Sequence, residues 1–501
     1  MKYVKCATYE GIDAKVVEVE SSLTKGLPSF NIVGIASTSI NESKERVKSA
    51  LLSNDYTFPP KRFVISLTPS DLKKQGSHFD LSIALLLLMD SEEIDISEWF
   101  VFGELSLDGQ VRENNSLYPL ILSLANQRLI KRVIVPKESL EKLTKIPDIE
   151  FYGVSHINEA LNILKCQDSS FTPAPPTTLP YKFIHTDEAL FFHNNYPYDF
   201  KDVRGQSVAK RAALISAAGF HNLLLEGSPG CGKSMIAQRI RYILPPLSSS
   251  EILDVAKLQA LDGYEPDFIP LRPFRSPHHT STTASIFGGG SHSAKIGEVG
   301  LSHNGILFFD ELPHYNKNIL EALREPLQDN HIRISRVNSK VEYPASFLFI
   351  SAMNPCPCGN LLNSAKECRC SELEIQRYKN RLSDPFLDRI DLHVTMQNVT
   401  YDDKSDLTSQ ELHQRVLHTI AFIAKRGQRT FNGKLNDEEI EKYCVLDKEA
   451  QSTLEGAIER FALSFRSIKK LQKVARTIAD LEQSEMIRKK DILEALSYRR
   501  R

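Results

Sequence analysis

Short apolar runs that end in polar clusters recur through the middle of the chain. Residues 222–227 (NLLLEG), 305–311 (GILFFDE) and 346–354 (SFLFISAMN) are apolar without alternation. Such runs are typical of strands in a parallel sheet that is covered on both faces. Because ligands of open α/β sheets bind at the carboxyl ends of the strands, the polar residues after these runs are candidates for one shared site.

Different patterns flank this region. The N-terminal part mixes strand-like runs (RFVISL, KRVIVP) with helical runs (FDLSIALLLLM, LYPLILSLANQRL), which predicts an α+β domain. Residues 169–182 are rich in Pro, Ser and Thr and predict an extended linker. Helical periods dominate after about residue 404. We therefore expect a multidomain α/β protein with an N-terminal domain (1–165), a linker (166–196), a core with a parallel sheet (197–400) and an all-α lid (401–501).

Composition narrows the class of protein. Hydrophobic residues make up 41% and charged residues 25% of the 501 residues, and no run of about 18 apolar residues offers a membrane span. The net charge of -1 means that any nucleic acid must be held by a local basic surface. The first 20 residues alternate polar and apolar positions and lack the apolar centre of a signal peptide, so we expect a cytoplasmic protein without membrane contact.

A phosphate-binding motif follows the first of the apolar runs. Residues 227–234, GSPGCGKS, match the pattern G-x-x-x-x-G-K-[ST] in full, between a strand-like run and the helical run KSMIAQRIRYIL. The glycines let backbone N–H groups close around phosphate oxygens, Lys233 would reach the terminal phosphates, and Ser234 would bind Mg²⁺. The predicted ATP-binding residues are Gly227, Ser228, Pro229, Gly230, Cys231, Gly232, Lys233 and Ser234.

Polar residues after the other two runs fit a hydrolytic site. Asp310 is placed to be a second Mg²⁺ ligand, and Glu311 to orient and deprotonate an attacking water. Asn354 could position the same water. Taken alone, an Asp-Glu pair also fits a solvated strand end, and an Asn before Pro355 also fits a turn. The motif upstream favours the catalytic interpretation.

Four of the eight cysteines are clustered. Cys356, Cys358, Cys368 and Cys370 read C-P-C, nine residues, C-R-C. Four thiolates meet the tetrahedral demand of a structural Zn²⁺, although an iron–sulfur cluster, a redox-active pair or free thiols are alternatives. The adjacent His278 and His279 are expected to diverge and are not predicted as metal ligands.

These motifs resemble those of one known family. The chain is similar to the ComM/YifB family of magnesium-chelatase-like AAA+ ATPases in GSPGCGKS, FRSPHHTST, GILFFDELPHY, SAMNPCPCG, PFLDRIDLHV and SFRSIKKLQKVARTIADL. The resemblance covers nearly the whole chain. It implies an AAA+ core with a helix-2 insert, assembly into a homo-oligomeric ring, expected to be a hexamer, and ATP-driven movement on DNA. In the ComM branch it implies a helicase that promotes branch migration during homologous recombination in natural transformation.

Two arginines take roles from this resemblance. Arg389 in PFLDRIDL resembles an arginine finger, and Arg466 in SFRSIKK resembles the sensor-2 arginine of the lid. A finger supplied by a neighbouring subunit makes hydrolysis depend on assembly and is worth about 10³ to 10⁵ in rate. An isolated arginine would more often form a surface ion pair.

Basic segments suggest where single-stranded or branched DNA could bind. Residues 271–303 match the family's helix-2 insert, and HIRISRVNSKVEYPASF predicts a hairpin that carries Arg333, Arg336 and Lys340. Basic residues on such a hairpin can follow phosphates without reading bases. Residues 459–501 hold 12 Lys and Arg against 6 Asp and Glu, which fits a nucleic-acid face or a solvated lid.

The N-terminal domain resembles a protease without its catalytic pair. Residues 63–165 are similar to the Lon protease catalytic domain, which implies a ribosomal S5 domain 2-like α+β fold. Lon-type proteolysis needs a Ser activated by a Lys, but Ser77 is one position off and Tyr118 stands where the Lys would be. We expect a proteolytically inactive domain. A chelatase motor subunit and a Lon-type protein-remodelling ATPase remain the alternatives to a DNA motor.

Overall fold

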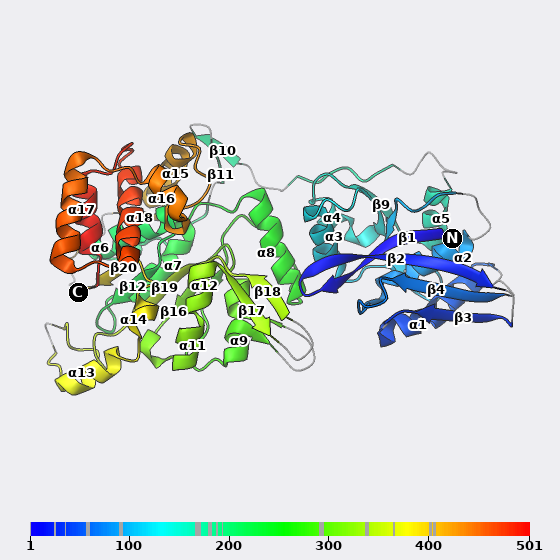
Figure 1. Ribbon diagram of the computed structural model, residues 1–501, viewed down its shortest axis with the longest axis horizontal. Helices are drawn as coiled ribbons and strands as arrows, with labels where there is room; N and C mark the ends of the chain where they lie inside the picture. Colours follow the sequence, from blue (N-terminus) through cyan, green and yellow to red (C-terminus); the bar gives the residue numbers. More distant parts are fainter. Residues whose placement is uncertain are drawn as a thin grey trace. The chain divides into compact units, whose positions relative to one another are not determined.

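The computed structural model describes most of the chain as two compact units. The first unit comprises residues 1–180, 256–268 and 335–342, and the second unit comprises the remainder. The two units are described separately below (Figure 1). The described residues are 2–24, 27–35, 37–56, 61–89, 94–165, 172–178, 183–186, 189–192, 194–289, 295–335, 340–363, 366–399, 403 and 407–500.

A seven-stranded mixed sheet organises the first unit. The strand order is β3-β4-β2-β1-β5-β8-β9. β1 and β2 pair antiparallel along their whole length, whereas β5, β8 and β9 run parallel to one another. The predicted runs RFVISL and KRVIVP lie in β4 and β8, so both strand predictions are confirmed. The strands are β1 (Lys2–Glu10), β2 (Asp13–Thr24), β3 (Ser29–Val33), β4 (Arg62–Thr68), β5 (Phe100–Val101), β8 (Arg132–Pro136) and β9 (Glu150–Val154), with a separate pair β6 (Glu104–Leu105) and β7 (Val111–Arg112).

Helices pack on this sheet, and one of them is almost wholly buried. In α2 the side chains of Asp80 to Leu87 are all buried, which explains why its sequence has no polar face. The single carboxylate there, Asp80, is bound by Arg46, with Nε 2.7 Å from Oδ2. Burial raises the pKa of Asp80, and the guanidinium opposes that rise. The helices are α1 (Thr38–Leu52), α2 (Asp80–Leu88), α3 (Leu117–Asn126), α4 (Leu140–Leu143) and α5 (Ile157–Leu164).

The second unit is built on a five-stranded parallel sheet. Its strand order is β13-β16-β19-β12-β20, so β12 and β19 are internal neighbours (Figure 1). All four residues of β16 and all six of β19 are buried, as expected for strands covered on both faces. The three strands predicted from unalternating apolar runs are confirmed as β12, β16 and β19. The strands are β12 (Leu223–Glu226), β13 (Phe274–Arg275), β16 (Ile306–Phe309), β19 (Leu348–Met353) and β20 (Leu392–Thr395).

Part of the expected insert belongs to this sheet. Phe274 of β13 pairs in parallel with Ile306 of β16, so the start of the segment 271–303 is an edge strand of the core. Because this strand has only two residues and lies between prolines, the hydrophobic pattern did not predict it. The rest of that segment forms α9 (Thr283–Phe287), β14 (Gly288–Gly289), β15 (Lys295–Ile296) and α10 (Glu298–Leu301).

Further helices and short strand pairs belong wholly or in part to the second unit. α6 and α7 pack against each other, and α7 packs on β19. The predicted hairpin is present as β17 paired with β18. These elements are α6 (Ser207–Gly219), α7 (Lys233–Ile243), α8 (Ser249–Leu261), α11 (Lys317–Ala322), α12 (Arg324–Asp329), α13 (Glu372–Lys379) and α14 (Asp384–Leu387), with the strand pairs β10 (Phe183–Thr186) with β11 (Ala189–Phe192) and β17 (His331–Ser335) with β18 (Lys340–Pro344).

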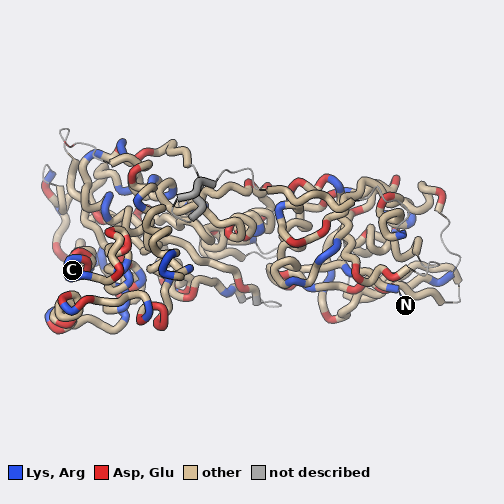
Figure 2. The backbone as a smooth tube through the Cα atoms, turned by 90° about the horizontal axis from the view of Figure 1, so that it is seen from above, with Lys and Arg blue, Asp and Glu red and all other residues tan. Residues whose placement is uncertain are grey.

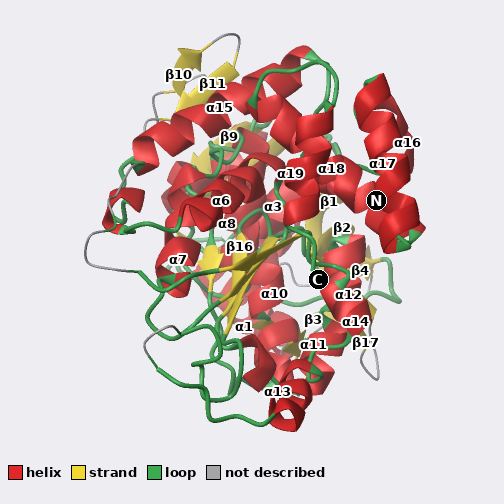
Figure 3. Cartoon of the chain, turned by 90° about the vertical axis from the view of Figure 1, so that its left-hand side faces the viewer, coloured by secondary structure: helices red, strands yellow, loops and turns green. Residues whose placement is uncertain are grey.

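The C-terminal part of the second unit is helical, as its sequence predicts (Figure 3). α15 begins with a capping box in which Thr408 and Glu411 satisfy each other's backbone N–H groups. One face of α18 is apolar and joins the same buried cluster as the strands of the core sheet. The helices are α15 (Ser409–Lys425), α16 (Asp437–Tyr443), α17 (Lys448–Phe461), α18 (Phe465–Leu481) and α19 (Lys489–Ser497).

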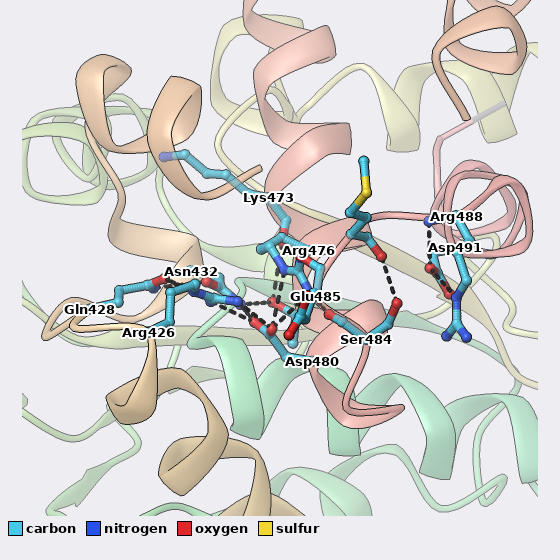
Figure 4. A network of polar contacts seen from close by, with 12 residues as sticks. Arg426, Gln428, Asn432, Lys473, Arg476, Asp480, Ser484, Glu485, Arg488 and Asp491 are labelled. Atoms are coloured by element: carbon cyan, nitrogen blue, oxygen red, sulfur yellow. Dashed lines mark hydrogen bonds and ion pairs between the residues drawn. The ribbon is translucent and has the colours of Figure 1, made fainter. Parts of the chain in front are cut away.

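A buried polar network joins α18 to the end of α15 (Figure 4). Asp480 accepts two hydrogen bonds from Arg426, at 2.7 and 3.0 Å, and one from Asn432 at 2.7 Å. Arg476, one helical turn before Asp480, donates to the same carboxylate at 3.1 Å. Arg476 and Asp480 are both 0% exposed. Since each buried charge has partners, the network holds the helices in register without an unpaired ion.

The distribution of charged residues and the hydropathy of the helices agree with the expectations from the sequence. Lys and Arg are interspersed with Asp and Glu along the tube of the chain (Figure 2), in line with the net charge of -1. None of the helices in the described part of the chain combines the length and the apolar character that crossing a bilayer requires.

Removing the Asp480 carboxylate should destabilise the helical region. Asp480→Ala leaves Arg426 and Arg476 buried without a counter-charge, which costs about 3–5 kcal/mol. Asp437→Ala is the matched control, because Asp437 pairs with Lys469 at 2.6 Å but its side chain is 74% exposed, so its loss should cost about 1 kcal/mol or less. Urea unfolding followed by circular dichroism tests the difference.

The fluorescence of the single tryptophan, Trp99 in the first unit, provides an internal reference in the same samples. Its transition should not move in either variant. Equal shifts of the helical transition in the two variants would contradict the role assigned to the network.

Candidate functional site

The glycine-rich loop lies between β12 and α7. Gly230 and Gly232 have φ angles of +82° and +96°, and a Cβ at either position would meet nothing within 4 Å. Glycine is required there by the left-handed backbone and not by crowding. The loop therefore leaves open space beside its backbone, at the N-terminus of α7, where phosphate oxygens can bind N–H groups.

Lys233 connects this loop to the end of β19. Its Nζ donates to the carbonyl oxygens of Gly227 at 2.6 Å and Ser228 at 3.0 Å, and to Oδ1 of Asn354 at 3.1 Å. Burial lowers the pKa of Lys233, while the carboxylates of Asp310 and Glu311 act in the opposite direction. The predicted loop lysine and the predicted polar sensor are thus in direct contact.

Ser234 and Asp310 form the second contact of the site. The Ser234 hydroxyl donates to Oδ2 of Asp310 at 2.7 Å. A hydroxyl and a carboxylate are the oxygen ligands that Mg²⁺ accepts from P-loop proteins. The donor set therefore fits Mg²⁺ at the predicted position.

Glu311 projects from a strained position next to Asp310. Its φ is +52°, its N–H donates to Oδ1 of Asp310 at 2.9 Å, and its side chain is 53% exposed. A non-glycine residue in the left-handed region is uncommon and is often found at functional sites. The turn aims the carboxylate away from the sheet toward solvent, where a water can reach it.

Sequence reasoning missed His279 as a member of this site. Its Nδ1 lies 3.4 Å from Oε2 of Glu311, and its ring lies 4.1 Å from that of His278. The expectation that the two histidine side chains diverge is therefore wrong, because the loop after β13 brings the two rings together at an interplanar angle of 35°. The repeated histidine in SPHHT was the available signal, and only the tertiary contact gives it meaning.

Arg389 and Arg466 gather at a different place. Both guanidinium groups donate to Oε1 of Gln328, at 2.9 and 3.0 Å, and Arg389 also donates to the carbonyl of Pro385. Burial lowers the pKa of Arg389, and the positive charges of Arg466 and Arg324 lower it further. Two cations thus share one neutral amide oxygen, while Arg324 pairs with Glu321 at 2.7 Å, and none of these hydrogen-bond partners belongs to the P-loop. Sequence reasoning missed Gln328 and Arg324.

The four clustered cysteines come together in space. The Sγ atoms of Cys356, Cys358, Cys368 and Cys370 all lie within 4.8 Å of one another. None of the four is in a disulfide. The donor set fits a tetrahedral metal.

The predicted DNA-contacting residues are only partly described. Arg333 lies on β17 and is exposed, whereas Arg336 and the side chain of Lys340 lie outside the described residues. Several cations of segment 459–501 are used internally, since Lys470 donates to the carbonyl of Ile390 at 2.9 Å and Arg476 binds Asp480. The basic excess of that segment therefore serves the helical region in part.

Ser77 in the first unit has neutral and acidic partners. Its hydroxyl donates to Glu104 and accepts from Asn114 Nδ2 at 3.1 Å. Tyr118 is 3% exposed. The nearby Lys74 donates to the carbonyl of Pro69. None of these contacts brings a lysine amine to Ser77 as its base.

Comparison with known proteins gives one family along the chain. Residues 199–404 match the family described as magnesium chelatase, subunit ChlI. Residues 19–139 match the description subunit ChlI of Mg-chelatase, and residues 406–499 match magnesium chelatase, subunit ChlI C-terminal.

Two relatives are similar over nearly their whole length, and a third over a shorter part. The chain is 36% identical over 502 residues to the competence protein ComM of Haemophilus influenzae, which covers 98% of this chain and 95% of that protein. Its identity to the protein YifB of Escherichia coli is 36% over 504 residues, with the same coverage of 98% and 95%. The magnesium-chelatase 67 kDa subunit of Heliobacterium mobile is 21% identical over 183 residues, which is 30% of this chain and 27% of that protein.

Loss of the Lys233 ammonium should abolish ATP turnover. Lys233→Ala removes the one side-chain cation of the loop, and the loss of such a preorganised donor costs about 10² to 10³ in rate. Lys201→Ala is the control, because Lys201 is 65% exposed and lies 3.9 Å from Asp199. A phosphate-release assay should show loss in the first variant only. Undiminished turnover by Lys233→Ala would refute the assignment of the phosphate site.

Proposed function

We propose that this chain, which belongs to the magnesium chelatase subunit ChlI family of AAA+ type, hydrolyses ATP to drive movement on DNA. The observation that carries the ATPase part is a pair of contacts, Lys233 with Asn354 and Ser234 with Asp310. They bring the loop and two strand ends to one place. An ordinary turn at a strand end would not need this combination of groups.

The residues of the site divide the chemistry between them. Lys233 and the loop N–H groups bind the phosphate oxygens, and Glu311 orients a water and takes its proton as the water attacks the terminal phosphorus. The bond from that phosphorus to the bridging oxygen breaks, and ADP leaves with this oxygen. Asn354 holds the lysine and offers its amide to the same water. A Mg²⁺ held by Ser234 and Asp310 would neutralise the charge that develops on the phosphates. The exposed carboxylate of Glu311 and its His279 partner support this division.

Arg389 and Arg466 are proposed to act on the nucleotide of a neighbouring subunit. Arg389 and Arg466 repel each other and share the neutral Oε1 of Gln328, and an anion placed between them would relieve this repulsion. A terminal phosphate presented across a subunit boundary fits that need. Homo-oligomerisation into a ring, expected to be a hexamer, follows as part of the proposal.

The relatives and the β17–β18 hairpin support action on DNA. The ComM relative is named a competence protein, and Arg333 of β17 is an exposed cation beside the segment that carries Arg336 and Lys340. Basic side chains of this kind can contact the backbone phosphates of DNA with any base sequence. We infer helicase activity that promotes branch migration in recombination and natural transformation. The chelatase relative favours remodelling of a protein partner as the second candidate.

The first unit is proposed to be a Lon-like domain without proteolytic activity. Its buried α2 follows Ser77, and that serine is bound by Glu104 and Asn114 and not by a lysine. The serine of a Lon-type protease needs a lysine amine as its base. The domain would then serve the motor as a scaffold. The cysteine cluster completes the proposed sites with a structural Zn²⁺.

Mixing two inactive variants tests the shared site. Arg389→Ala should lower turnover by about 10³ or more, and Lys233→Ala should also be inactive. A mixture of the two should recover activity well above either alone, because an intact loop can then meet an intact arginine of a neighbour.

Lys233→Ala mixed with Glu311→Gln is the control for this experiment. Both changes damage the same side of the proposed boundary, so every site in the mixture keeps one defect. Recovery in the control, or none in the Arg389→Ala mixture, would count against an arginine supplied by a neighbour.

A branch-migration assay tests the DNA part of the proposal. The protein with ATP should bind single-stranded and branched DNA at low salt and move a three-strand junction. Arg333→Glu should weaken binding and lower the slope of log K against log salt by about 1. Lys448→Glu, a charge reversal at an exposed position in α17, is the control. Wild-type protein that hydrolyses ATP but does not bind DNA would favour protein remodelling.

A further inference from the structure

The cysteine cluster has the dimensions of a filled metal site. Sγ of Cys356 lies 3.4 Å from that of Cys358 and 3.7 Å from that of Cys368, and Cys358 lies 3.7 Å from Cys368. A tetrahedron with Zn–S bonds of about 2.3 Å has edges of about 3.8 Å, whereas a disulfide would bring two sulfurs to about 2.05 Å. Four protein ligands leave no open position, so the site is structural and not catalytic.

One ligand is rooted next to the phosphate site. Cys356 is fully buried and lies two residues after Asn354, whose amide accepts from Lys233 at 3.1 Å. Cys358 is exposed, and Cys368 and Cys370 are partly exposed. The metal loop, residues 356–363, therefore leads from the buried end of β19 to exposed positions, with its inner end beside the lysine.

The metal loop packs directly on the P-loop. Gly359 has φ of +76° and is buried, and a Cβ there would lie 2.6 and 2.7 Å from Cδ and Cγ of Pro229. Its N–H donates to the carbonyl of Cys356 at 3.0 Å. The backbone of Gly359, in the turn after Cys358, is therefore in close contact with Pro229 of the P-loop.

The helix after the last ligand contacts the other flank of the P-loop. Ser371 caps α13 directly after Cys370, and Lys379 at the end of α13 pairs with Glu226 at 2.9 Å. Glu226 is the last residue of β12, immediately before the P-loop. The metal loop therefore contacts the P-loop at Pro229, and α13 contacts Glu226, the residue before the P-loop.

We propose that the four-cysteine site binds one Zn²⁺ and that this metal holds the P-loop and Asn354 in their nucleotide-binding positions. The inference rests on the proposed ATPase function and adds a control of its nucleotide site. Without the metal, the four sulfur atoms are no longer bound to one common ion, so the contact between the backbone of Gly359 and Pro229 is lost. Nucleotide affinity then falls, because positioning errors near 1 Å are costly in such sites.

The glycine contact can be tested apart from the metal. Gly359→Ala should retain zinc and weaken binding of a fluorescent ATP analogue about tenfold or more. Gly427→Ala is the matched control, because Gly427 has φ of +74° and a Cβ there meets nothing within 4 Å. It carries the same backbone strain without the contact, so its affinity should stay at the wild-type value. Equal affinities of the two variants would overturn the contact.

The metal itself is tested with Cys358→Ser in the full chain. Protein purified without chelators should contain one zinc per chain, and the variant should lose zinc and bind the analogue about tenfold or more weakly, with its circular dichroism unchanged. Substoichiometric zinc in the wild type, or the visible absorption of an iron–sulfur cluster, would overturn the metal assignment.

The outcomes separate this inference from the proposed function. A variant that loses zinc but binds the analogue as the wild type does would refute the coupling while leaving the ATPase intact. Wild-type protein that holds zinc but binds no nucleotide would refute the ATPase proposal instead.

Discussion

The parallel register of β12, β16 and β19 is the constraint on which the candidate site depends. Leu223 pairs with Ile350, and Ile306 pairs with Leu348, so the three strands end at one edge of the sheet. A slip of one residue would turn every side chain to the opposite face and bury polar groups. The ladder therefore brings the P-loop, Asp310 and Asn354 together although they are far apart in the sequence.

Two groups of charged side chains in the second unit differ in the partners that they have. The Asp480 network gives each of its buried charged groups hydrogen-bond partners and holds helices together (Figure 4). Around Gln328, the guanidinium groups of Arg389 and Arg466 share a neutral amide oxygen, and the pKa of Arg389 is lowered by burial and by repulsion from Arg466 and Arg324. A satisfied network rigidifies a fold, whereas an unsatisfied cluster of cations is suited to receive an anion. The first kind of cluster stabilises the unit, and the second kind is available for function.

The candidate nucleotide site is held by groups on several sides. Lys233 is bound by carbonyl oxygens of its own loop and by Asn354, and the metal loop lies against Pro229 through Gly359. Glu311 is held by its own strained turn and contacts His279. Precise chemistry requires such support because the P-loop itself is rich in glycine and has little side-chain packing of its own.

The sequence alone determined the main elements and most members of the site. Unalternating apolar runs predicted β12, β16 and β19, and the spacing of GSPGCGKS predicted the loop with Lys233 and Ser234, because both signals are local properties of the chain. It did not determine β13, whose two residues are too few for a pattern, or the roles of His279 and Gln328. Those depend on contacts between residues distant in sequence. Only the tertiary structure could decide them, since packing brings such side chains within hydrogen-bond distance and no local period encodes it.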